Sequence, residues 1–490
     1  MCSPASCSSR MHGSTLREPR VAVVGGGVSG LVAARELARA GAAVTVIERD
    51  EHLGGRVRGA ALCGAPFDVG AEAFATRAGA VEELVSDLGL TTHIVHPARL
   101  GSWVVTAEGA RPLPPGGAVG IPVRPLAAEA RAHLGLRGAV RAAVEPLLRR
   151  DRAGSAASDA PETLGALVRR RLGERVLDSL VRPIALGVYS TDPDRLELSA
   201  VPGLAAAYAR TGSLVRAARQ LRDASAHAGG AVAALAGGMT ALTGALVADV
   251  RDRGVEIRTG TRVVELTRGV SEHPAAPGRR SEPQWMLRDS VGKTILRCDA
   301  VLLAVPESVA ATLLAERTPP PREHDIEVVA LAVADTRLDA APRGTGALVA
   351  DGAGIAAKAL THVTAKWPDR AATVPAGTHV LRLSYGRAGV APETAGLSDT
   401  ETLGLACRDA SLILGVPIDS AAVRDWVRQP WIVGAPPGPT PRLLPPPGVD
   451  VAGDWVSGTG LASVVPGARA AAARLLTHLS PMNESSVSSA

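Results

Sequence analysis

Runs of apolar residues alternate with glycine-rich turns near the start of the chain. Residues 21–24 are four apolar residues directly before glycines, which is typical of a buried parallel strand. Residues 29–40 are rich in helix formers and place their apolar side chains on one face. A second apolar run, residues 44–47, is followed by Glu48. The pattern predicts a strand, a helix and a second strand in close succession.

The rest of the chain changes its pattern several times. Residues 126–226 are rich in Ala, Leu and Arg and predict a mainly helical region. Another helix is expected from Gly237, followed by strands at residues 255–257 and 300–305. Residues 325–390 alternate β-type runs with turns, and we expect Lys366 on one of these strands. A last strand, a glycine-rich turn and an alanine-rich helix are expected over residues 450–476.

Three stretches break this order. Residues 151–162 are small and polar and predict a flexible loop. Residues 271–284 are rich in Pro, Ser and Arg and predict an insertion in a hairpin. Residues 435–449 hold many prolines, which exclude regular structure.

The composition narrows the class of protein. The chain has 490 residues, of which 46% are hydrophobic and 21% charged, and a net charge of +5. Its Lys and Arg form no dense run with interleaved aromatics, so we expect no nucleic-acid partner. The weak positive charge is compatible with an anionic substrate or a peripheral contact with an anionic membrane. No apolar stretch of about 20 residues occurs, so no transmembrane segment is expected.

Cysteine and histidine usage point to a reduced, metal-free protein. The five cysteines, at positions 2, 7, 63, 298 and 407, form no CxxC motif, which favours free thiols in the cytoplasm. The eleven histidines show no HxH or HExxH spacing, so no metal site is proposed. Residues 1–20 lack the apolar core of a signal peptide and are expected to be a disordered extension, with Met11 an alternative start.

The first glycine-rich turn carries the clearest chemistry. Gly25-Gly26-Gly27-Val28-Ser29-Gly30 follows the first strand and opens the helix. In such a turn the first glycine allows the sharp bend, the second lets the backbone approach a pyrophosphate, and the third permits close packing of helix on strand. Glu48, at the end of the second strand, suits the ribose hydroxyls. The spacing predicts a Rossmann-type dinucleotide site.

Two further motifs separate this chain from simple NAD dehydrogenases. Leu53-Gly54-Gly55-Arg56 follows the ribose acid, and Phe67-Asp68-Val69-Gly70-Ala71-Glu72 comes next. Together they resemble the flavin-containing amine oxidase superfamily, which includes protoporphyrinogen oxidases, amine oxidases and phytoene desaturases. The resemblance implies that Gly55 and Arg56 lie against the diphosphate of FAD. It also implies that the segment ending at Glu72 passes beside the flavin ring.

The end of the chain resembles the closing motif of the same superfamily. Ala452-Gly453-Asp454-Trp455 is followed by Gly458 to Ser463 and by Pro466-Gly467-Ala468-Arg469. The resemblance implies that Asp454 meets the ribityl-diphosphate and that a helix N-terminus faces the flavin pyrimidine. The residues assigned to the cofactor by motif or resemblance are Gly25, Gly26, Gly27, Val28, Ser29, Gly30, Glu48, Arg49, Gly55, Arg56, Gly70, Ala71, Glu72, Ala73, Val263, Trp426, Gly453, Asp454, Leu461, Ala462 and Ser463.

Three stretches resemble one branch of the superfamily, the protoporphyrinogen and coproporphyrinogen oxidases. They are residues 182–196, residues 366–387 and Gly237-Gly238-Met239 with Leu242. The resemblance implies oxygen-dependent, six-electron oxidation of coproporphyrinogen III to coproporphyrin III in haem biosynthesis, with H₂O₂ as the second product. Protoporphyrinogen IX remains an alternative substrate, and so does an amine or a polyene. The segment after Trp426 departs from the branch, because it lacks the usual Tyr and His.

The substrate partners are expected to be basic, because porphyrinogens carry propionates. Arg77, Arg182, Lys366 and Arg382 lie in or beside the branch-like segments, and the alternative for each is a solvated surface base. No cysteine stands near the closing motif, so FAD is expected to be non-covalent. No side-chain base is identified, and a non-catalytic flavin-binding protein is the alternative of a different class.

These observations predict an α/β fold, α+β overall. We expect a Rossmann-like FAD-binding domain of discontinuous segments, a β-sheet substrate domain and a helical excursion. The expected boundaries are 1–20 for the extension, 21–95, 227–310 and 448–479 for FAD binding, 96–125 and 311–447 for the substrate domain, 126–226 for the helical domain and 480–490 for a flexible tail.

Overall fold

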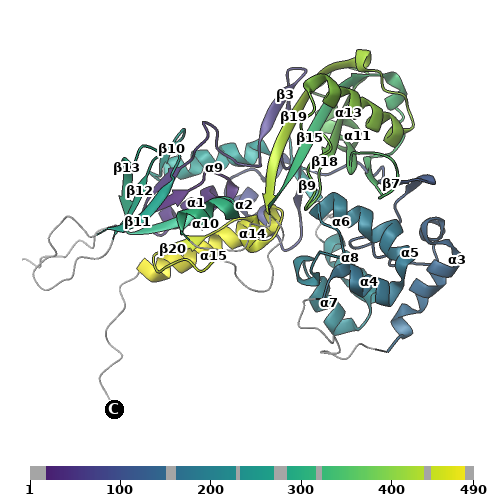
Figure 1. The fold of residues 1–490 in the computed structure, drawn as a ribbon, viewed down its shortest axis with the longest axis horizontal. Coiled ribbons are helices and arrows are strands. Elements are labelled where there is room, and N and C mark those ends of the chain that lie inside the picture. The colour runs from purple at the N-terminus through teal and green to yellow at the C-terminus, as the bar shows by residue number, and fades with distance from the viewer. Residues whose placement is uncertain are drawn as a thin grey trace, which may run out of the picture.

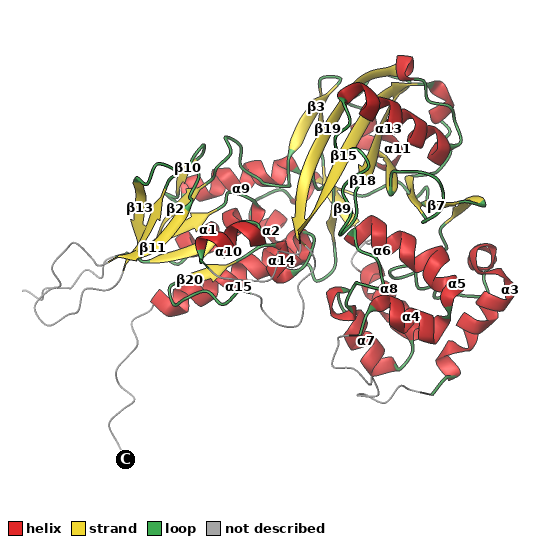
Figure 2. Cartoon of the chain, viewed as in Figure 1, coloured by secondary structure: helices red, strands yellow, loops and turns green. Residues whose placement is uncertain are grey.

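Three bodies make up the computed structural model of the protein, which describes residues 18–149, 162–227, 232–269, 284–315, 323–434 and 443–479. In Figure 1 a body built on a parallel sheet lies to the left, a long sheet rises at the upper right, and a cluster of helices lies below that sheet. Figure 2 shows that the lower right body is almost entirely helical. The mixed α/β class expected from the sequence is confirmed.

The left-hand body is centred on a five-stranded sheet in the order β10-β2-β1-β14-β20, with every pairing parallel. Its strands come from separated parts of the chain: β1 (Arg20–Val24), β2 (Ala43–Ile47), β10 (Glu256–Arg258), β14 (Ala300–Leu303) and β20 (Val449–Val451). Helices α1 (Val28–Arg39), α2 (Ala80–Asp87), α9 (Thr240–Asp252), α10 (Glu307–Leu313) and α15 (Leu461–Leu479) surround it.

The two faces of this sheet have separate cores because side chains alternate along each strand. Val21 and Val23 of β1 pack in a core with α1, α9 and α15. Ala22 and Val24 pack in a second core with Trp285 and Leu287. The second core lies under an antiparallel sheet of β11 (Glu265–Gly269), β12 (Gln284–Arg288) and β13 (Thr294–Cys298).

The predicted β1-α1-β2 unit, α9, β10, β14 and the closing β20 and α15 are confirmed. The glycine-rich turn between the last two elements also forms a short helix that was not expected, α14 (Asp454–Ser457). Smaller pairings complete this body: β3 (Gly59–Leu62) with β4 (Ala65–Asp68), and β9 (Val232–Leu235) with β5 (Phe74–Ala75) and β6 (Ile94–Val95).

The upper body is a seven-stranded sheet in the order β19-β15-β18-β17-β16-β7-β8. Its bounds are β7 (Trp103–Thr106), β8 (Gly109–Pro112), β15 (Glu323–Ala334), β16 (Gly346–Val349), β17 (Ala359–His362), β18 (Thr378–Tyr385) and β19 (Val423–Gly434). Helix α13 (Asp399–Leu414) covers one face, where Leu331, Leu383 and Ile413 share a core. Residues of the opposite face, including Ala330 and Val380, join the core of the left-hand body.

The expected strand at Lys366 is wrong. Lys366 is the last residue of α11 (Val363–Lys366), and α12 (Pro368–Ala371) follows directly. The Trp367 amide donates to the Val363 carbonyl at 2.8 Å, which closes one helical turn. That turn brings Val363 and Trp367 together in the core of the left-hand body. Residues four apart are neighbours on one side of a helix, whereas in a strand they would be more than 10 Å apart, by a rise of about 3.3 Å per residue.

The helical body contains α3 (Ala128–Val144), α4 (Leu164–Leu172), α5 (Glu174–Val176), α6 (Arg182–Tyr189), α7 (Leu204–Thr211) and α8 (Leu214–His227) around a core of its own. The helical character expected for this region is confirmed. None of the helices in the described part of the chain combines the length and hydropathy needed to cross a membrane.

Several expectations lie outside the described residues. They include the extension before residue 18, the loop at 151–161, the tail from 480, most of the insertion at 271–284 and residues 435–442. The strands that flank the insertion, β11 and β12, pair antiparallel through Gly269 and Gln284.

Candidate functional site

A cavity of about 970 Å³ opens at the carboxyl edge of the five-stranded sheet and extends to the seven-stranded sheet. Residues at the ends of four strands line it: Gly25, Glu48 and Ala304 directly follow β1, β2 and β14, and Gly453 lies two positions after β20. In open parallel sheets, ligands bind in the crevice outside the carboxyl ends of the strands. The cavity is therefore the first candidate for a binding site.

The three predicted glycines of the first turn have different surroundings. Gly25 has φ +108°, and a Cβ on it would collide with the Ala304 carbonyl. A Cβ on Gly30 would collide with the carbonyl oxygen of Gly25. A Cβ on Gly27 would meet only the Gly55 Cα, at 3.8 Å. Gly25 and Gly30 thus serve packing, while Gly27 leaves free space that faces the cavity.

The N-terminus of α1 opens onto this space. Gly27 is the N-cap residue of α1, and no side chain of the described residues accepts a capping hydrogen bond from the first turn of the helix. The first turn also contains no acidic residue. The hydroxyl of Ser29 is buried and has no hydrogen-bond partner in the described structure. Free amides and the positive end of the helix dipole favour an anion such as a phosphate.

Glu48 organises the chain at the end of β2. Its Oε2 accepts from the Gly26 amide at 2.6 Å, and its Oε1 accepts from the Asp50 amide at 3.0 Å. A carboxylate has further acceptor sites, so Glu48 can also receive a hydroxyl of a bound ligand. Arg49 and Val263 line the same end of the cavity.

The second glycine pair lies against the first turn. The Gly54 amide donates to the Gly26 carbonyl at 2.8 Å, and a Cβ on Gly55 would come within 3.1 Å of the Gly27 Cα. Arg56 Nη2 lies 2.8 Å from Oδ2 of the buried Asp454. This ion pair joins the start of the site to its C-terminal part.

Only part of the segment predicted to pass beside a flavin ring lines the cavity, and that part ends at Ala71. Gly70 and Ala71 line the cavity, and the Ala71 amide donates to the Arg56 carbonyl at 2.9 Å. Glu72 lies outside the lining and forms a partly buried ion pair with Lys366. Burial raises the pKa of Glu72, but the positive charges of Lys366 and Arg382 outweigh it, so the net pKa is lowered.

The four basic residues predicted to bind the substrate lie in different surroundings. Arg382 lines the cavity, donates from Nη2 to the Gly70 carbonyl at 2.9 Å, and keeps a buried Nε with no partner among the described residues. Arg77 lies outside the lining and donates to the Ser463 hydroxyl at 3.3 Å. Lys366 is engaged by Glu72. Arg182 lies on α6, outside the lining, where three aspartates bind it.

Trp426 and Trp431 occupy opposite faces of β19. Opposite Leu331 of β15, Trp426 packs on the α13 side of the sheet. Trp431 pairs with Ile326, lines the cavity and donates from Nε1 to the Val69 carbonyl at 2.9 Å. The guanidinium of Arg58 stands 5.9 Å from the Trp431 ring. The sequence reasoning missed Trp431, although five residues is an odd spacing that puts the two side chains on opposite faces of a strand.

The predicted cofactor residues fall into two groups. Those that line the cavity are Gly25, Gly27, Val28, Ser29, Glu48, Arg49, Gly55, Arg56, Gly70, Ala71, Val263, Gly453, Asp454 and Leu461. Those outside the lining are Gly26, Gly30, Glu72, Ala73, Trp426, Ala462 and Ser463. Gly26 and Gly30 support the first group through the contacts described above, and Ser463 accepts from Arg77.

Known proteins resemble this chain over nearly its whole length. The sequence model described as flavin containing amine oxidoreductase matches residues 28–476. Coproporphyrinogen III oxidase of Mycobacterium tuberculosis is 33% identical over 93% of this chain and 96% of that protein. The Bacillus subtilis protein of the same name is 26% identical over 81% and 83%. A crystal structure from Exiguobacterium sp. 255-15 has a TM-score of 0.74 at 23% identity, covers 95% of this chain and 99% of its own, and shows the same fold.

Proposed function

The chain belongs to the flavin containing amine oxidoreductase family, and we propose that it is an FAD-dependent coproporphyrinogen III oxidase of haem biosynthesis. The proposed reaction removes six electrons and six hydrogens from the porphyrinogen in three two-electron steps. Three O₂ accept these electrons and become three H₂O₂. The assignment of a porphyrinogen substrate rests on the relatives named coproporphyrinogen III oxidase, which match this chain over most of its length.

One observation carries the cofactor proposal. A single cavity runs from the uncapped N-terminus of α1 to Arg382 and Trp431 of the seven-stranded sheet. The room at Gly27, the unpartnered hydroxyl of Ser29 and the Arg56–Asp454 pair fit an extended ligand with a diphosphate at its centre. We propose that Glu48 and Val263 hold the adenosine of FAD, Gly27, Gly55 and Arg56 its diphosphate, and Gly70 and Ala71 its flavin ring.

Bound FAD would supply the hydride and electron transfer, and the residues of the chain provide position and electrostatics. Leu461 begins α15 at the cavity, so the positive end of that helix dipole favours developing negative charge there. Arg382 adds a fixed positive charge to the lining of the cavity. The described lining contains no cysteine, which supports non-covalent binding.

Arg382 is the best-supported partner for a substrate propionate. Its Nη2 donates to the Gly70 carbonyl, but its buried Nε has no partner in the described structure. Because a guanidinium has five donors, Arg382 can still bind a carboxylate. We propose Arg77 as a second partner, because it lies beside Ser463 at the start of α15. Lys366 stays a weaker prediction because Glu72 neutralises it. We leave Arg182 out, because its aspartates already compensate its charge.

Anaerobic mixing with each porphyrinogen tests the proposal. Coproporphyrinogen III is expected to bleach the flavin absorbance and to yield porphyrin fluorescence faster than protoporphyrinogen IX. Faster reaction of protoporphyrinogen IX would reverse the substrate assignment. A flavin that stays oxidised with both, but is reduced by an amine or a polyene, would leave only the family assignment.

The location of the protein in the cell is also part of the proposal. The cytoplasmic location expected from the scattered cysteines stays a prediction, and Cys63, Cys298 and Cys407 are free thiols in the structure. The expected peripheral contact with an anionic membrane also stays a prediction.

A further inference from the structure

A buried lysine lies where the helical body meets the seven-stranded sheet. Lys358, directly before β17, is only 2% exposed. Its Nζ donates to the Ser190 hydroxyl, at the end of α6, at 2.6 Å and to the Gly386 carbonyl, directly after β18, at 2.7 Å. An ammonium has three donors, and no carboxylate of the described residues lies within ion-pair distance of this one. When Lys358 is protonated, its charge is therefore buried without a counterion.

This lysine lies close to the wall of the cavity. The backbone of Gly386, which accepts from Lys358, packs on β15, since a Cβ there would lie 2.5 Å from the Asp325 carbonyl oxygen. Asp325 and the next residue, Ile326, line the cavity. Arg382 lines it too and is near enough for its charge to act on Lys358. Lys358 thus adds its charge to that of Arg382 where the seven-stranded sheet borders the cavity.

The charge of Lys358 is sensitive to pH. Burial lowers the pKa of Lys358 to about 7, and the charges of Arg387 and Arg382 add to this effect, while Glu393 opposes it. His324 of β15 is also buried, and burial together with the charge of Lys358 lowers the pKa of His324 to about 4. Near neutral pH, His324 is therefore uncharged, whereas Lys358 changes its charge.

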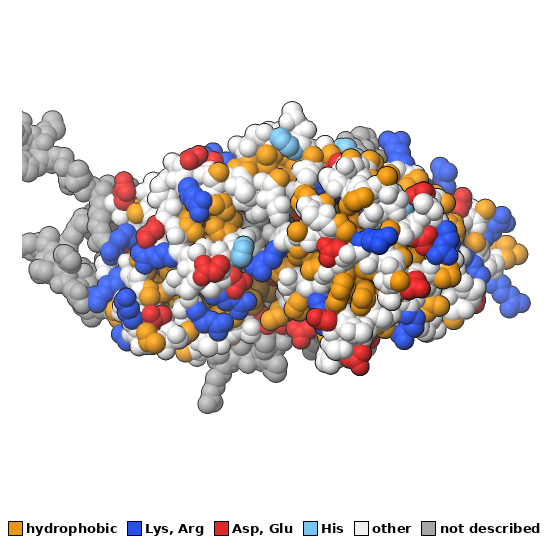
Figure 3. Space-filling view, turned by 90° about the horizontal axis from the view of Figure 1, so that it is seen from above, with side chains coloured by type: hydrophobic (Ala, Val, Ile, Leu, Met, Phe, Trp, Pro, Cys, Tyr) orange, Lys and Arg blue, Asp and Glu red, His pale blue; other side chains and the backbone are white. Residues whose placement is uncertain are grey.

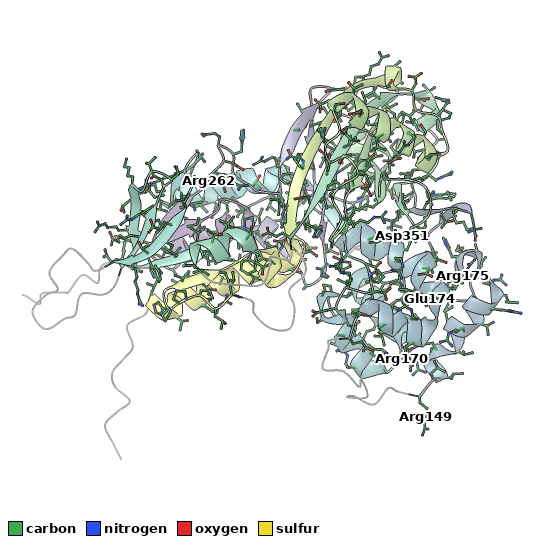
Figure 4. All side chains as sticks on the ribbon, in the orientation of Figure 1. Arg149, Arg170, Glu174, Arg175, Arg262 and Asp351 are labelled. Atoms are coloured by element: carbon green, nitrogen blue, oxygen red, sulfur yellow. The ribbon has the colours of Figure 1, made fainter. Side chains whose placement is uncertain are left out.

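Other charged residues of this junction have partners. Arg387 pairs with Asp351, which Figure 4 shows where the seven-stranded sheet meets the helical body. Arg195 of the helical body donates from Nη1 to the Ala388 carbonyl at 3.3 Å. Figure 3 shows basic and acidic side chains intermingled over the middle of one face, so that face offers no single basic patch to an anion.

Lysine is a rare choice in this chain. Only three of its 53 basic residues are lysines, at positions 293, 358 and 366. Arginine stays charged when it is buried, whereas a buried lysine changes its pKa and costs stability while it is charged. A destabilising buried charge beside a cavity is a candidate for a role in binding.

We propose that Lys358 is a specificity-determining residue, whose buried charge favours a substrate with four carboxylates over one with two. The inference rests on the proposed porphyrinogen oxidation and extends it. Coproporphyrinogen III carries four propionates and protoporphyrinogen IX two, so a positive charge beside the cavity gains more from the former. Contact is not required, because a charge in a site of low dielectric acts over several ångströms.

Steady-state kinetics on both porphyrinogens between pH 6 and pH 8.5 test the proposal. In the wild type, KM for coproporphyrinogen III should rise about threefold to tenfold over this range, because Lys358 loses its charge, while KM for protoporphyrinogen IX should change less. Lys358→Met should show the raised KM at every pH. Lys358→Arg, which stays charged, should keep the preference without its pH dependence. Lys293→Met, on an exposed lysine, is the matched control and should behave as the wild type does.

Thermal unfolding supplies a readout that needs no substrate. The pKa of Lys358 is about 7 in the folded protein and about 10.4 in an unfolded chain, so the unfolded state binds more protons between these values. The melting temperature of the wild type should therefore rise, relative to that of Lys358→Met, as the pH increases from 7 to 9. Affinity for the tetracarboxylate should fall in the same direction, which a purely structural lysine would not produce.

The outcomes separate this inference from the substrate assignment, which depends on the porphyrinogen that the wild type prefers. The inference depends on how that preference changes. If wild type and Lys358→Met have the same ratio of KM values at every pH, the inference is wrong, and Lys358 only holds α6 against the sheet. If Lys358→Met does not fold, the wild type decides alone, because a ratio that stays constant from pH 6 to pH 8.5 overturns the proposal.

Discussion

Arg382 of the seven-stranded sheet donates from Nη2 to the carbonyl oxygen of Gly70, at 2.9 Å, in the segment proposed to carry the flavin ring. The hydrogen bond joins the two bodies that enclose the cavity. It also leaves the remaining donors of the guanidinium for a ligand, since the buried Nε has no partner in the described structure. Arg382 can therefore hold the Gly70 segment with one donor and bind an anionic group of a substrate with another.

The first prediction concerns Arg382→Ala. It is expected to raise KM for coproporphyrinogen III about tenfold to a hundredfold, and KM for protoporphyrinogen IX less, because a buried charge pair with a propionate is lost. Arg382→Lys keeps the charge but loses the planar fork, so it should recover part of the effect. Steady-state kinetics on both substrates measure this. Equal changes for both would mean that Arg382 serves the Gly70 segment alone.

The second prediction compares two glycines of the same turn. Gly27→Ala should fold with an unchanged melting temperature of the apoprotein, because its Cβ meets no protein atom closer than 3.8 Å. Its affinity for FAD should fall at least about tenfold, because the Cβ enters the space of the diphosphate. Gly30→Ala should instead destabilise the fold, since its Cβ collides with the Gly25 carbonyl.

Titration of both apoproteins with FAD, together with thermal unfolding, distinguishes the two effects. Gly404→Ala is a matched control, because a Cβ there meets nothing within 4 Å on α13. A Gly27→Ala protein that purifies with its full complement of flavin would contradict the diphosphate site.

The sequence was most informative where local periodicity and burial act together. The β1-α1-β2 unit could be predicted because apolar strands, a helical face and glycines with fixed roles occur within residues 20–47. The three-segment sheet followed from resemblance and not from local pattern, since nothing in β20 itself shows that it pairs with β14. Pairing between distant strands depends on the tertiary fold.

Individual side chains at the site were harder to predict because their partners are distant in sequence. Lys366 looked like a substrate cation, yet Glu72, far along the chain, neutralises it. Arg182 lies in a family-like segment, but Asp178, Asp192 and Asp194 bind it. Trp426 was assigned to the cofactor and Trp431 was missed, because the face of the sheet that a side chain occupies depends on the register of the strand, which a sequence motif does not specify.

The third prediction is a pH dependence of stability. Burial lowers the pKa of His362 to about 4, and the neighbouring His379 adds to this effect. The folded state therefore keeps His362 neutral, while the unfolded state binds a proton below about 6.5. Stability from this residue is fully present above 6.5 and falls as the pH decreases from 6.5 to 4, by up to about 3 kcal/mol.

Urea unfolding at pH 7.5 and pH 5 of the wild type and His362→Gln measures this contribution. The difference between the two pH values should be smaller in the variant. The pH dependence of the wild type has to be compared with that of the variant, because other groups also contribute to it. Burial raises the pKa of Asp68 to about 6, so the contribution of Asp68 to stability increases as the pH falls, opposite to that of His362. His52→Gln, on an exposed histidine, should behave as the wild type does. An unchanged pH difference in His362→Gln would rule out the buried neutral histidine.

The last prediction concerns the stability of the helical body. Glu145 is fully buried and accepts from Arg171 Nε at 3.0 Å, from the Ser213 hydroxyl at 2.5 Å and from the Leu214 amide at 2.9 Å. It thus pairs the buried Arg171 and caps the N-terminus of α8 at the same time. Glu145→Leu should destabilise the protein by about 3–5 kcal/mol, because it leaves a buried guanidinium without its carboxylate.

The double variant Glu145→Leu with Arg171→Met tests the cause. If the unpaired charge dominates, the double variant should be more stable than Glu145→Leu alone, even though the cap of α8 is still missing. If the cap dominates, both variants should be equally unstable. Thermal unfolding monitored by circular dichroism measures the stability, and flavin fluorescence reports the cofactor cavity separately. Because Glu145 packs in the helical body and the cavity lies between the other two, FAD affinity should change little in either variant. A large loss of FAD in Glu145→Leu under conditions where it remains folded would show that the helical body and the cavity are coupled.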